Sequence, residues 1–425
     1  MSYNIDTKCV QSGWNPKNTE PRVLPIIQST TFKFDSSEDM AKCFDLEESN
    51  YFYTRLQNPT NDAVANKIAA LEGGVAAMLT SSGQAATFYS IVNICNAGDH
   101  VVSSSAVYGG SYNLLAHTMK DLGIEVTFVE PDCSKADLKA AFTPKTKCVF
   151  GETLANPALK ILDIELFAEA AHQHRVPLIV DNTFPTPINC RPIEWGADIV
   201  IHSTTKYMDG HATSVGGAVV DSGNFDWQAN TDKFPELTTP NTTYHGTIFT
   251  ETYGKAAYIG KMVTTLMRDL GSIPSPHNSF LLNIGLETLH LRMERHCANA
   301  RKVADHLKNN PKITWIKYPD LKDDEDHQLA QKYLSNGSSG VVIFGVQGGR
   351  AGATKFMDSL KLAAVVTHVA DCRTCVLHPA STTHRQMNDL ELEAAGVKPD
   401  LIRLSVGVEN VDDIIADIDQ ALAQI

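Results

Sequence analysis

Residues 198–217 read DIVIHSTTKYMDGHATSVGG, a stretch that combines two predicted strands with a single lysine. The apolar run 199–201 predicts a buried strand, and residues 216–221 predict a second one. The first strand ends in the hydroxyl residues 203–205, and Lys206 follows them directly. A buried amine carries a desolvation cost, so a lysine between two buried strands indicates a chemical role.

A covalent bond between lysine and an aldehyde would explain this position. A lysine bonded in this way does not need a full charge at neutral pH, and lysine supplies such a bond in enzymes that use pyridoxal 5'-phosphate (PLP). The neighbouring hydroxyl groups of Ser203 and Thr205 would then bind the phosphate of the cofactor. The alternative is an ordinary surface lysine that follows a strand.

Strand and helix patterns alternate over residues 76–202 of the chain. We predict strands at 76–80, 99–104, 124–130, 147–151, 177–181 and 198–202, with helices near 81–95, 110–121, 135–142 and 164–174. This alternation predicts an α/β fold with a mainly parallel sheet covered on both faces. Ligands gather at the carboxyl ends of the strands in such sheets. We therefore expect Gly83, Asp181 and residues 203–206 to lie close together.

The side chains at these strand ends suit one cofactor. Gly83 and Gln84 begin a predicted helix, whose first backbone N–H groups are unpaired and can bind an anion. Asp181 ends the most apolar strand and would pair with a protonated pyridine nitrogen. Tyr108 could stack on the cofactor ring. The alternatives are a plain helix start, a capping or turn aspartate, and a tyrosine packed in the core.

The N-terminal region precedes this alternating pattern and lacks clear periodicity. Residues 1–58 are rich in polar and aromatic side chains, and we expect them to form an arm that packs on another body, often a second subunit. The helix that starts at Thr60 places Val64, Ile68 and Leu71 on one face and stops at residues 73–74.

The C-terminal part begins after a cluster of helix-breaking residues. Residues 249–269 predict one long helix, and residues 271–276, GSIPSP, end it. We expect a domain boundary there, which gives an arm (1–58), a cofactor domain (59–270) and a C-terminal domain (271–425). In the last domain we predict helices at 279–309 and 411–425 and strands at 340–345, 374–378 and 401–406.

Composition excludes several classes of partner. The net charge of −13 without a basic stripe argues against nucleic acid and anionic membranes. The first residues have no signal-peptide pattern, and no apolar run reaches membrane-spanning length. Nine cysteines scattered along the chain suit reduced thiols in the cytoplasm.

The main alternative to a PLP enzyme, from another class of protein, is a zinc-binding protein. Cys372, Cys375 and His378, with His384 beyond, could in principle bind a tetrahedral zinc. However, residues 374–378 predict a strand, whose neighbouring side chains point to opposite faces. His202 and His211 flank Lys206, and we expect both to be packed or hydrogen-bonded rather than catalytic. The Gly-rich patch 345–352 matches no nucleotide-binding motif and predicts an ordinary loop.

Several motifs recur in a fixed order along the chain. They are Thr54-Arg55 with Asn58-Pro59-Thr60, Ser82-Gly83-Gln84, Tyr108-Gly109, Glu152-Thr153 with Asn156-Pro157, residues 180–183, residues 202–207, Thr367-His368, residues 378–384 and residues 403–407. Together they resemble the Cys/Met-metabolism PLP enzymes, which include cystathionine synthases and lyases, methionine γ-lyases and homoserine-ester sulfhydrylases. The resemblance covers nearly the whole chain. Residues 82–85, 216–227 and 378–384 are most similar to the O-acetylhomoserine sulfhydrylases.

This resemblance implies an aspartate-aminotransferase type of fold, PLP as the cofactor, no metal, and a homotetramer built from two catalytic dimers. Lys206 would hold the cofactor, Asp181 would contact its ring nitrogen, and Tyr108 would stack on the ring, so these three would be catalytic. The implied cofactor-binding residues are Tyr53, Arg55, Ser82, Gly83, Gln84, Tyr108, Asn156, Asp181, Ser203, Thr205 and Lys206, with Tyr53 and Arg55 contributed by a neighbouring subunit. The implied substrate-binding residues are Asn156, Thr367 and Arg403.

The resemblance to the sulfhydrylases also implies a reaction. Sulfide or a thiol would replace the acetate of O-acetyl-L-homoserine to form homocysteine in methionine biosynthesis, with Lys206 as the general base. Methionine γ-lyase and cystathionine γ-synthase activities are the alternatives. At the positions of Tyr108, Gly109 and Gly110, the methionine γ-lyases carry a sequence that resembles Tyr-Gly-Cys. The glycine at position 110 of this chain therefore disfavours γ-lyase activity. Relatives commonly carry glycine in place of Ala212, and ordinary residues in place of Cys372 and Cys375.

Overall fold

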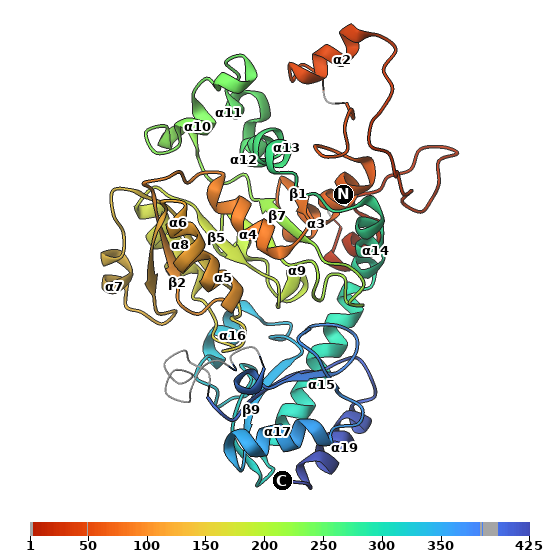
Figure 1. The fold of residues 1–425 in the computed structure, drawn as a ribbon, viewed down its shortest axis with the longest axis vertical. Helices are drawn as coiled ribbons and strands as arrows, with labels where there is room; N and C mark the ends of the chain where they lie inside the picture. The colour runs from red at the N-terminus through yellow and green to blue at the C-terminus, as the bar shows by residue number, and fades with distance from the viewer. Residues whose placement is uncertain (1–2, 49, 383–384, 386–397) are drawn as a thin grey trace.

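The computed structural model describes residues 3–48, 50–382, 385 and 398–425, and Figure 1 shows their arrangement. A seven-stranded sheet has the strand order β1-β7-β6-β5-β4-β2-β3. Its strands are β1 (Ala76–Thr80), β2 (His100–Ser104), β3 (Glu125–Val129), β4 (Thr146–Glu152), β5 (Leu178–Asp181), β6 (Ile199–His202) and β7 (Gly217–Asp221). β7 runs antiparallel to its neighbours β1 and β6, and the other pairs are parallel. The predicted α/β fold with a mainly parallel sheet is therefore confirmed.

Helices cover this sheet on both faces. Every residue of β5, β6 and β7 is buried, although successive side chains of a strand point to opposite faces. The covering helices include α3 (Pro59–Glu72), which contacts β1 and β7, and α4 (Gly83–Val92), which contacts β6 and β7. α8 (Ile164–Gln173) contacts β4 and β5. The α3 helix ends at Gly73, whose φ of 83° lies in the left-handed region that glycine favours.

A second, five-stranded sheet lies in the C-terminal part, with the order β10-β11-β12-β9-β8. Its strands are β8 (Ile313–Lys317), β9 (Val341–Val346), β10 (Ala364–Val365), β11 (Cys375–Leu377) and β12 (Leu401–Ser405). The helices α14 (Pro276–Glu287) and α15 (Leu289–Lys308) run from the first sheet to the second one (Figure 1). Buried apolar residues form two clusters, and α15 contributes Met293 to the first and Val303 to the second. The division into domains at residues 58 and 270 stays a prediction.

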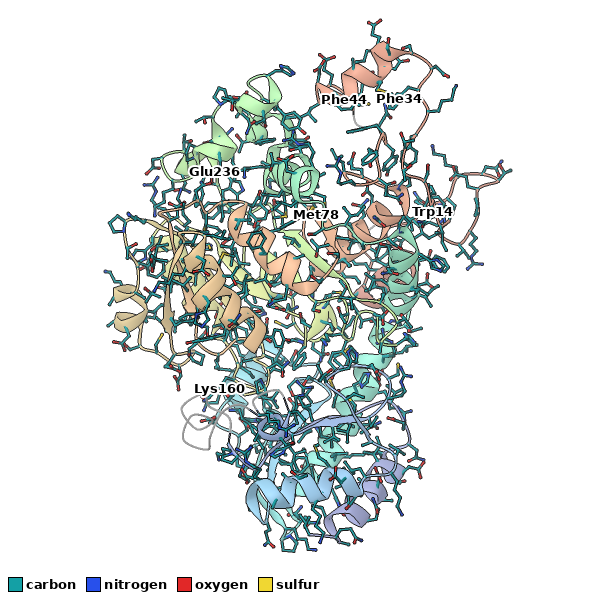
Figure 2. All side chains as sticks on the ribbon, viewed as in Figure 1. Trp14, Phe34, Phe44, Met78, Lys160 and Glu236 are labelled. Atoms are coloured by element: carbon teal, nitrogen blue, oxygen red, sulfur yellow. The ribbon has the colours of Figure 1, made fainter. Side chains whose placement is uncertain are left out.

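The N-terminal arm contacts α3 and α14 at residues 5–11 and extends away from the body of the chain around residues 37–44. It carries the short helices α1 (Ile5–Gln11) and α2 (Ser37–Phe44), and Figure 1 shows α2 at the top, well separated from the sheets. Phe34 and Phe44 lie on this outlying part (Figure 2), and Phe44 is 56% exposed. An arm with exposed aromatic side chains has no complete core of its own.

Two helix predictions in the C-terminal half are wrong in their continuity. The segment predicted as one helix at 249–269 is divided into α11 (Phe249–Tyr253) and a longer helical stretch in which α12 (Ala257–Met262) continues through a π-helical turn, Val263–Met267, into α13 (Arg268–Leu270). Gly254 interrupts it, because its φ of 55° and ψ of −125° are incompatible with a right-handed helix. The segment predicted at 279–309 divides at Thr288, whose φ is −111°.

Other elements were not predicted or differ from the prediction. The strands β8 and β10 and the helix α16 (His327–Tyr333) had not been expected. The Gly-rich patch is not simply a loop, because Gly349 and Gly352 belong to α17 (Gly349–Ser359). The closing amphipathic helix is confirmed as α19 (Val411–Leu422). No helix within the described ranges is long and apolar enough to cross a membrane.

Candidate active site

Lys206 lies in the turn that follows β6, at the carboxyl edge of the large sheet. The backbone N–H of Gly210 donates to the carbonyl of Lys206 at 2.8 Å, which closes a single helical turn after the strand. Burial and the positive charge of Arg403 lower the pKa of the Lys206 amine from 10.5 to about 8. A lysine with this pKa is partly unprotonated at neutral pH, which is the form that reacts with an aldehyde or accepts a proton.

Asp181 ends β5, the strand next to β6, and is 9% exposed. Its Oδ1 accepts hydrogen bonds from the backbone N–H and the hydroxyl of Thr183, at 3.0 and 2.5 Å. The same Thr183 hydroxyl accepts from the backbone N–H of Ser203 at 2.8 Å, which joins the two strand ends. Burial raises the pKa of Asp181, and the hydrogen bonds from Thr183 oppose this increase. A buried carboxylate of this kind is suited to a cationic partner such as a protonated pyridine nitrogen.

The start of α4 lies against the end of β6. The N-cap Ser82 accepts a hydrogen bond from the backbone N–H of Ala85 at 3.1 Å. The N–H groups of Gly83 and Gln84, at the first two positions of the helix, have no partner within the helix. A Cβ atom added to Gly83 would lie only 2.6 Å from the Cβ of Ser203. Glycine is therefore required for this close approach, which creates a site for an anion such as the cofactor phosphate.

Two other predicted phosphate ligands lie beside this helix start. Gln84 is the second residue of α4, and its side-chain oxygen lies 3.5 Å from the hydroxyl of Ser111. The hydroxyl of Thr205 accepts a hydrogen bond of 3.1 Å from the backbone N–H of Gly216. The donors and hydroxyls present here fit a phosphate group, and the buried Asp181 and Lys206 fit the ring and the aldehyde of PLP.

Arg403 on β12 brings the C-terminal sheet to the same site. Its Nη1 donates to Oδ1 of Asn156 at 3.1 Å, and its Nη2 donates to the carbonyl of Thr367 at 3.2 Å and to that of His368 at 3.4 Å. The predicted substrate-binding residues Asn156, Thr367 and Arg403 therefore lie together. Arg403 is 7% exposed, and burial lowers the pKa of its guanidinium. Among the described residues its guanidinium hydrogen-bonds to one side-chain amide and two carbonyls and to no carboxylate, which suits a substrate carboxylate.

Tyr108 is half exposed rather than packed in the core. Its relative exposure is 47%, so the interpretation as a core residue is wrong. Its backbone N–H donates to Oε2 of Glu152 at 2.6 Å. Because Glu152 is buried, this hydrogen bond fixes the backbone of Tyr108, while the exposed ring of Tyr108 remains available to contact a ligand.

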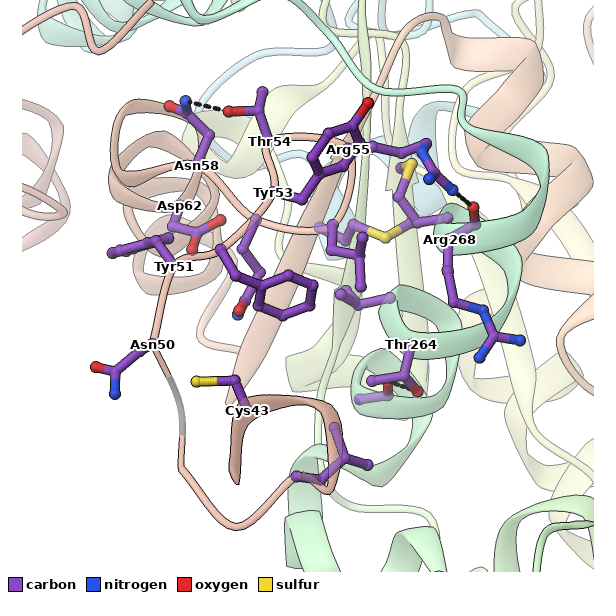
Figure 3. A pocket seen from close by; sticks show the side chains of 18 of the residues that line it. Cys43, Asn50, Tyr51, Tyr53, Thr54, Arg55, Asn58, Asp62, Thr264 and Arg268 are labelled. Carbon is purple, nitrogen blue, oxygen red and sulfur yellow. Dashed lines mark hydrogen bonds between the residues drawn. The ribbon is translucent and has the colours of Figure 1, made fainter. Parts of the chain in front are cut away.

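Tyr53 and Arg55 lie elsewhere in the chain. They line a cavity of about 880 Å³ between the arm and the segment 243–274, shown in Figure 3. Arg55 donates a hydrogen bond to the carbonyl of Arg268 there, and its guanidinium carbon lies 5.2 Å from the centroid of the Tyr53 ring. Among the described residues that line this cavity, neither Lys206 nor Asp181 appears. No hydrogen bond or ring contact within the described residues joins Tyr53 or Arg55 to Lys206 or Asp181 of the same chain.

The two histidines near Lys206 are hydrogen-bonded, as predicted. Nε2 of His202 lies 2.6 Å from Oε1 of Glu72, and both side chains are fully buried. Nδ1 of His211 lies 2.6 Å from the carbonyl of Asp209. Ala212 follows with a φ of 56°, so alanine adopts the left-handed conformation where relatives carry glycine.

The residues considered for zinc have other partners. Sγ of Cys375 donates to the carbonyl of His368 at 3.4 Å. The ring nitrogens of His378 lie 2.9 Å from the hydroxyl of Ser381 and 2.8 Å from the carbonyl of Pro399. His384 lies outside the described residues. Within the described part of the chain, no group of three His, Cys, Asp or Glu residues could hold a metal ion.

Glu152 and Thr183 belong to the site but have no role predicted from the sequence. Thr183 connects Asp181 to Ser203 through its hydroxyl, and Glu152 accepts from the backbone of Tyr108. Both residues lie at or just beyond the carboxyl ends of parallel strands, like the residues that were predicted. Their position at the carboxyl ends of these strands could therefore have identified both residues as members of the site.

Comparisons with known proteins agree with this geometry. The family described as Cys/Met metabolism PLP-dependent enzyme matches residues 6–423. The chain is 46% identical over 423 residues to a homocysteine synthase of Schizosaccharomyces pombe, covering 99% of this chain and 98% of that protein. It is 43% identical over 427 residues to an O-acetyl-L-homoserine sulfhydrylase of Corynebacterium glutamicum, covering 100% of this chain and 98% of that protein.

A crystal structure from Campylobacter jejuni is also similar along its whole length. That protein is described as an O-acetylhomoserine (thiol)-lyase and carries N'-pyridoxyl-lysine-5'-monophosphate. The TM-score is 0.95 at 36% sequence identity, and the match covers 99% of this chain and 100% of that chain. This chain belongs to the Cys/Met-metabolism PLP-dependent enzymes.

Proposed function

We propose that this chain catalyses the reaction of O-acetyl-L-homoserine with sulfide, which yields L-homocysteine and acetate. The observation that carries this proposal is the meeting of Lys206, Asp181 and Arg403 at the carboxyl edge of the large sheet. The relatives named homocysteine synthase and O-acetyl-L-homoserine sulfhydrylase support the substrate, because they match the chain over its full length. This reaction would place the enzyme in methionine biosynthesis.

We propose the following division of roles within the site. PLP, when bound, withdraws electrons from the substrate carbons and so makes their protons acidic. The amine of Lys206 takes the proton from Cα of the substrate, because its lowered pKa leaves part of it unprotonated at neutral pH. Arg403 binds the substrate carboxylate through its paired nitrogens, and Asn156 orients this guanidinium.

The remaining site residues are proposed to hold the cofactor. Asp181 keeps the ring nitrogen protonated, and Tyr108 covers a face of the ring. Ser82, Gly83, Gln84, Ser203 and Thr205 surround the phosphate. Because glycine at position 83 allows α4 to approach Ser203, the backbone donors and hydroxyls can act on one phosphate group.

We also propose that Tyr53 and Arg55 complete the active site of a partner subunit. Both residues lie on the arm and line a cavity whose described lining does not include the Lys206 of their own chain, and Tyr53 is 41% exposed. The guanidinium of Arg55 would bind the cofactor phosphate. The proposed assembly is a homotetramer made of two such dimers. We place it in the cytoplasm, since all nine cysteines are free.

The shared site can be tested with mixed dimers of Lys206→Ala and Arg55→Ala chains. Each variant alone is expected to be nearly inactive. In a mixed dimer, one site carries both defects and the other combines an intact Lys206 with an intact Arg55. After random reassortment half the dimers are mixed, so roughly a quarter of all sites should recover activity by two-fold symmetry. If isolated mixed dimers remain as inactive as the single variants, Arg55 acts within its own chain.

A panel of substrates tests the reaction itself. Purified holoenzyme is assayed with O-acetylhomoserine, O-succinylhomoserine, cystathionine and methionine, with and without sulfide, and Lys206→Ala serves as the control. We expect sulfide-dependent homocysteine formation from O-acetylhomoserine to be the fastest reaction. Release of methanethiol from methionine as the dominant activity would identify a γ-lyase instead and would reject the proposal.

A further inference from the structure

The side chain of Glu152 connects two loops of the candidate active site. Glu152 ends β4, and its carboxylate accepts the hydrogen bond of 2.6 Å from the backbone N–H of Tyr108. The backbone N–H of Asn156 interacts with the same carboxylate. Asn156 in turn accepts from Arg403 at 3.1 Å. A single carboxyl group therefore links the tyrosine that would cover the cofactor ring to the arginine that would bind the substrate.

Glu152 also lies beside Asp181. The two residues are register partners in the parallel β4–β5 pair, so their side chains leave the same face of the sheet. Their exposures are only 5% and 9%. Two neighbouring carboxyl groups in a buried site cannot both be ionised without a large electrostatic cost, so one of them keeps its proton.

Burial and the neighbouring negative charge, rather than the number of hydrogen bonds, indicate which carboxyl group keeps the proton. Asp181 accepts from the N–H and the hydroxyl of Thr183, and both donors favour its charged form. Burial, together with the negative charge of Asp181, raises the pKa of Glu152 well above its usual value. The backbone donors of Tyr108 and Asn156 oppose this increase. A carbonyl oxygen of a protonated acid still accepts such backbone hydrogen bonds.

We propose that Glu152 is a positioning residue that acts as a neutral carboxylic acid and holds the loops of Tyr108 and Asn156 against the cofactor site. This inference rests on the PLP site proposed above. A neutral acid at this position fixes both loops without competing with Asp181 for the cofactor ring. Glutamine has the same shape and also accepts hydrogen bonds, so it should substitute for most of this role.

Variants of the holoenzyme test this inference. Glu152→Ala and Glu152→Gln are compared with Asp221→Ala and Asp221→Asn, which change a buried carboxylate that accepts from the backbone of Gly223 at 2.8 Å. Asp221 is a matched control because it ends β7 and pairs with Ile199, the first residue of β6. It therefore lies at the amino ends of the parallel strands, opposite the candidate active site at their carboxyl ends. The measurements are the PLP dissociation constant, the circular dichroism of the cofactor's visible band, and KM and kcat for O-acetylhomoserine.

We expect Glu152→Ala to weaken PLP binding by roughly tenfold, since the backbone hydrogen bond from Tyr108 to a buried acceptor and the interaction with the backbone of Asn156 are lost. The circular dichroism of the cofactor band should change as well, because the ring of Tyr108 is no longer held in place. Glu152→Gln should restore most of the affinity and most of the circular dichroism signal. The Asp221 variants should retain the PLP affinity of the wild type.

Two results would overturn the inference. If Glu152→Gln folds normally and is as impaired as Glu152→Ala, an ionised carboxylate is required and the neutral acid is wrong. If Glu152→Ala binds PLP with unchanged affinity and circular dichroism, Glu152 does not position the site. Should the alanine variant fail to fold, Glu152→Asp, which withdraws the carboxyl group by one methylene, replaces it in the comparison. A wild-type protein that binds PLP but lacks sulfhydrylase activity would reject the proposed reaction and leave this test valid.

Discussion

The lowered pKa of Lys206 makes a quantitative prediction about how the cofactor-free protein captures PLP. The unprotonated amine is the reactive form. With a pKa of about 8, about 10% of the Lys206 side chains are unprotonated at pH 7, whereas an unperturbed lysine with a pKa of 10.5 would reach only about 0.03%. At pH 7 Lys206 should therefore react with PLP roughly 300 times faster than an unperturbed lysine of the same intrinsic reactivity.

The assay follows the visible band of the cofactor after PLP is mixed with the cofactor-free protein at a series of pH values. The rate should rise with pH and reach half its maximum near pH 8. In Arg403→Met, the midpoint should shift upward because a positive charge near the amine is lost, although burial still holds the pKa below 10.5. Arg301→Met is the control, since Arg301 is a half-exposed residue of α15 that pairs with Asp320.

A midpoint near 10.5 in the wild type would refute the reasoning, because it would mean that Lys206 is not desolvated. A downward shift in Arg403→Met would also contradict it, since the removal of a neighbouring cation favours the protonated amine.

Three further predictions concern the same site and its support. Asp181→Asn should lower kcat/KM by roughly 100-fold, or about 3 kcal/mol, because the ring nitrogen loses its charged partner; an activity within a few-fold of the wild type in a steady-state assay would reject that role. Gly83→Ala should weaken PLP binding by roughly tenfold or more, because the new Cβ would lie 2.6 Å from Ser203. Gly98→Ala, which strains a turn with a φ of 96°, is the control for general destabilisation in the titration. The free energy of unfolding of the cofactor-free protein should rise between pH 8 and 10.5, by up to about 3 kcal/mol from Lys206, since the unfolded lysine binds a proton there and the folded one does not. Denaturation of Lys206→Met should show a smaller rise than the wild type, and an equal rise would assign the effect to other groups.

The sequence was sufficient for the strands of the large sheet because each is a short apolar run between turn residues. Residues 178–181 are an example, and they form β5 with the predicted carboxyl end at Asp181. Since parallel strands share an edge, Gly83, Asp181 and Lys206 could be grouped from sequence alone. Helix continuity could not be predicted in the same way, because Gly254 and Thr288 interrupt segments whose apolar periodicity continues on both sides.

The position of the arm and the role of Glu152 depend on contacts between distant residues. Arg55 meets the carbonyl of Arg268, more than 200 positions away in the chain, and no local pattern encodes this meeting. The proximity of Glu152 to Asp181 follows from the register between β4 and β5, which a single sequence does not contain. The anchoring of Tyr108 by Glu152 has the same origin.

The most direct test of the account is the identity of the lysine that holds the cofactor. The holoenzyme is treated with borohydride, which makes the bond to PLP permanent, and the modified peptide is located by mass spectrometry. Lys261 is a suitable internal comparison, because it is also buried and burial lowers its pKa to about 8. We expect one pyridoxyl group per chain, on Lys206, and none on Lys261. A colourless protein that gains no absorbance from added PLP, or a pyridoxyl group on another lysine, would contradict this expectation.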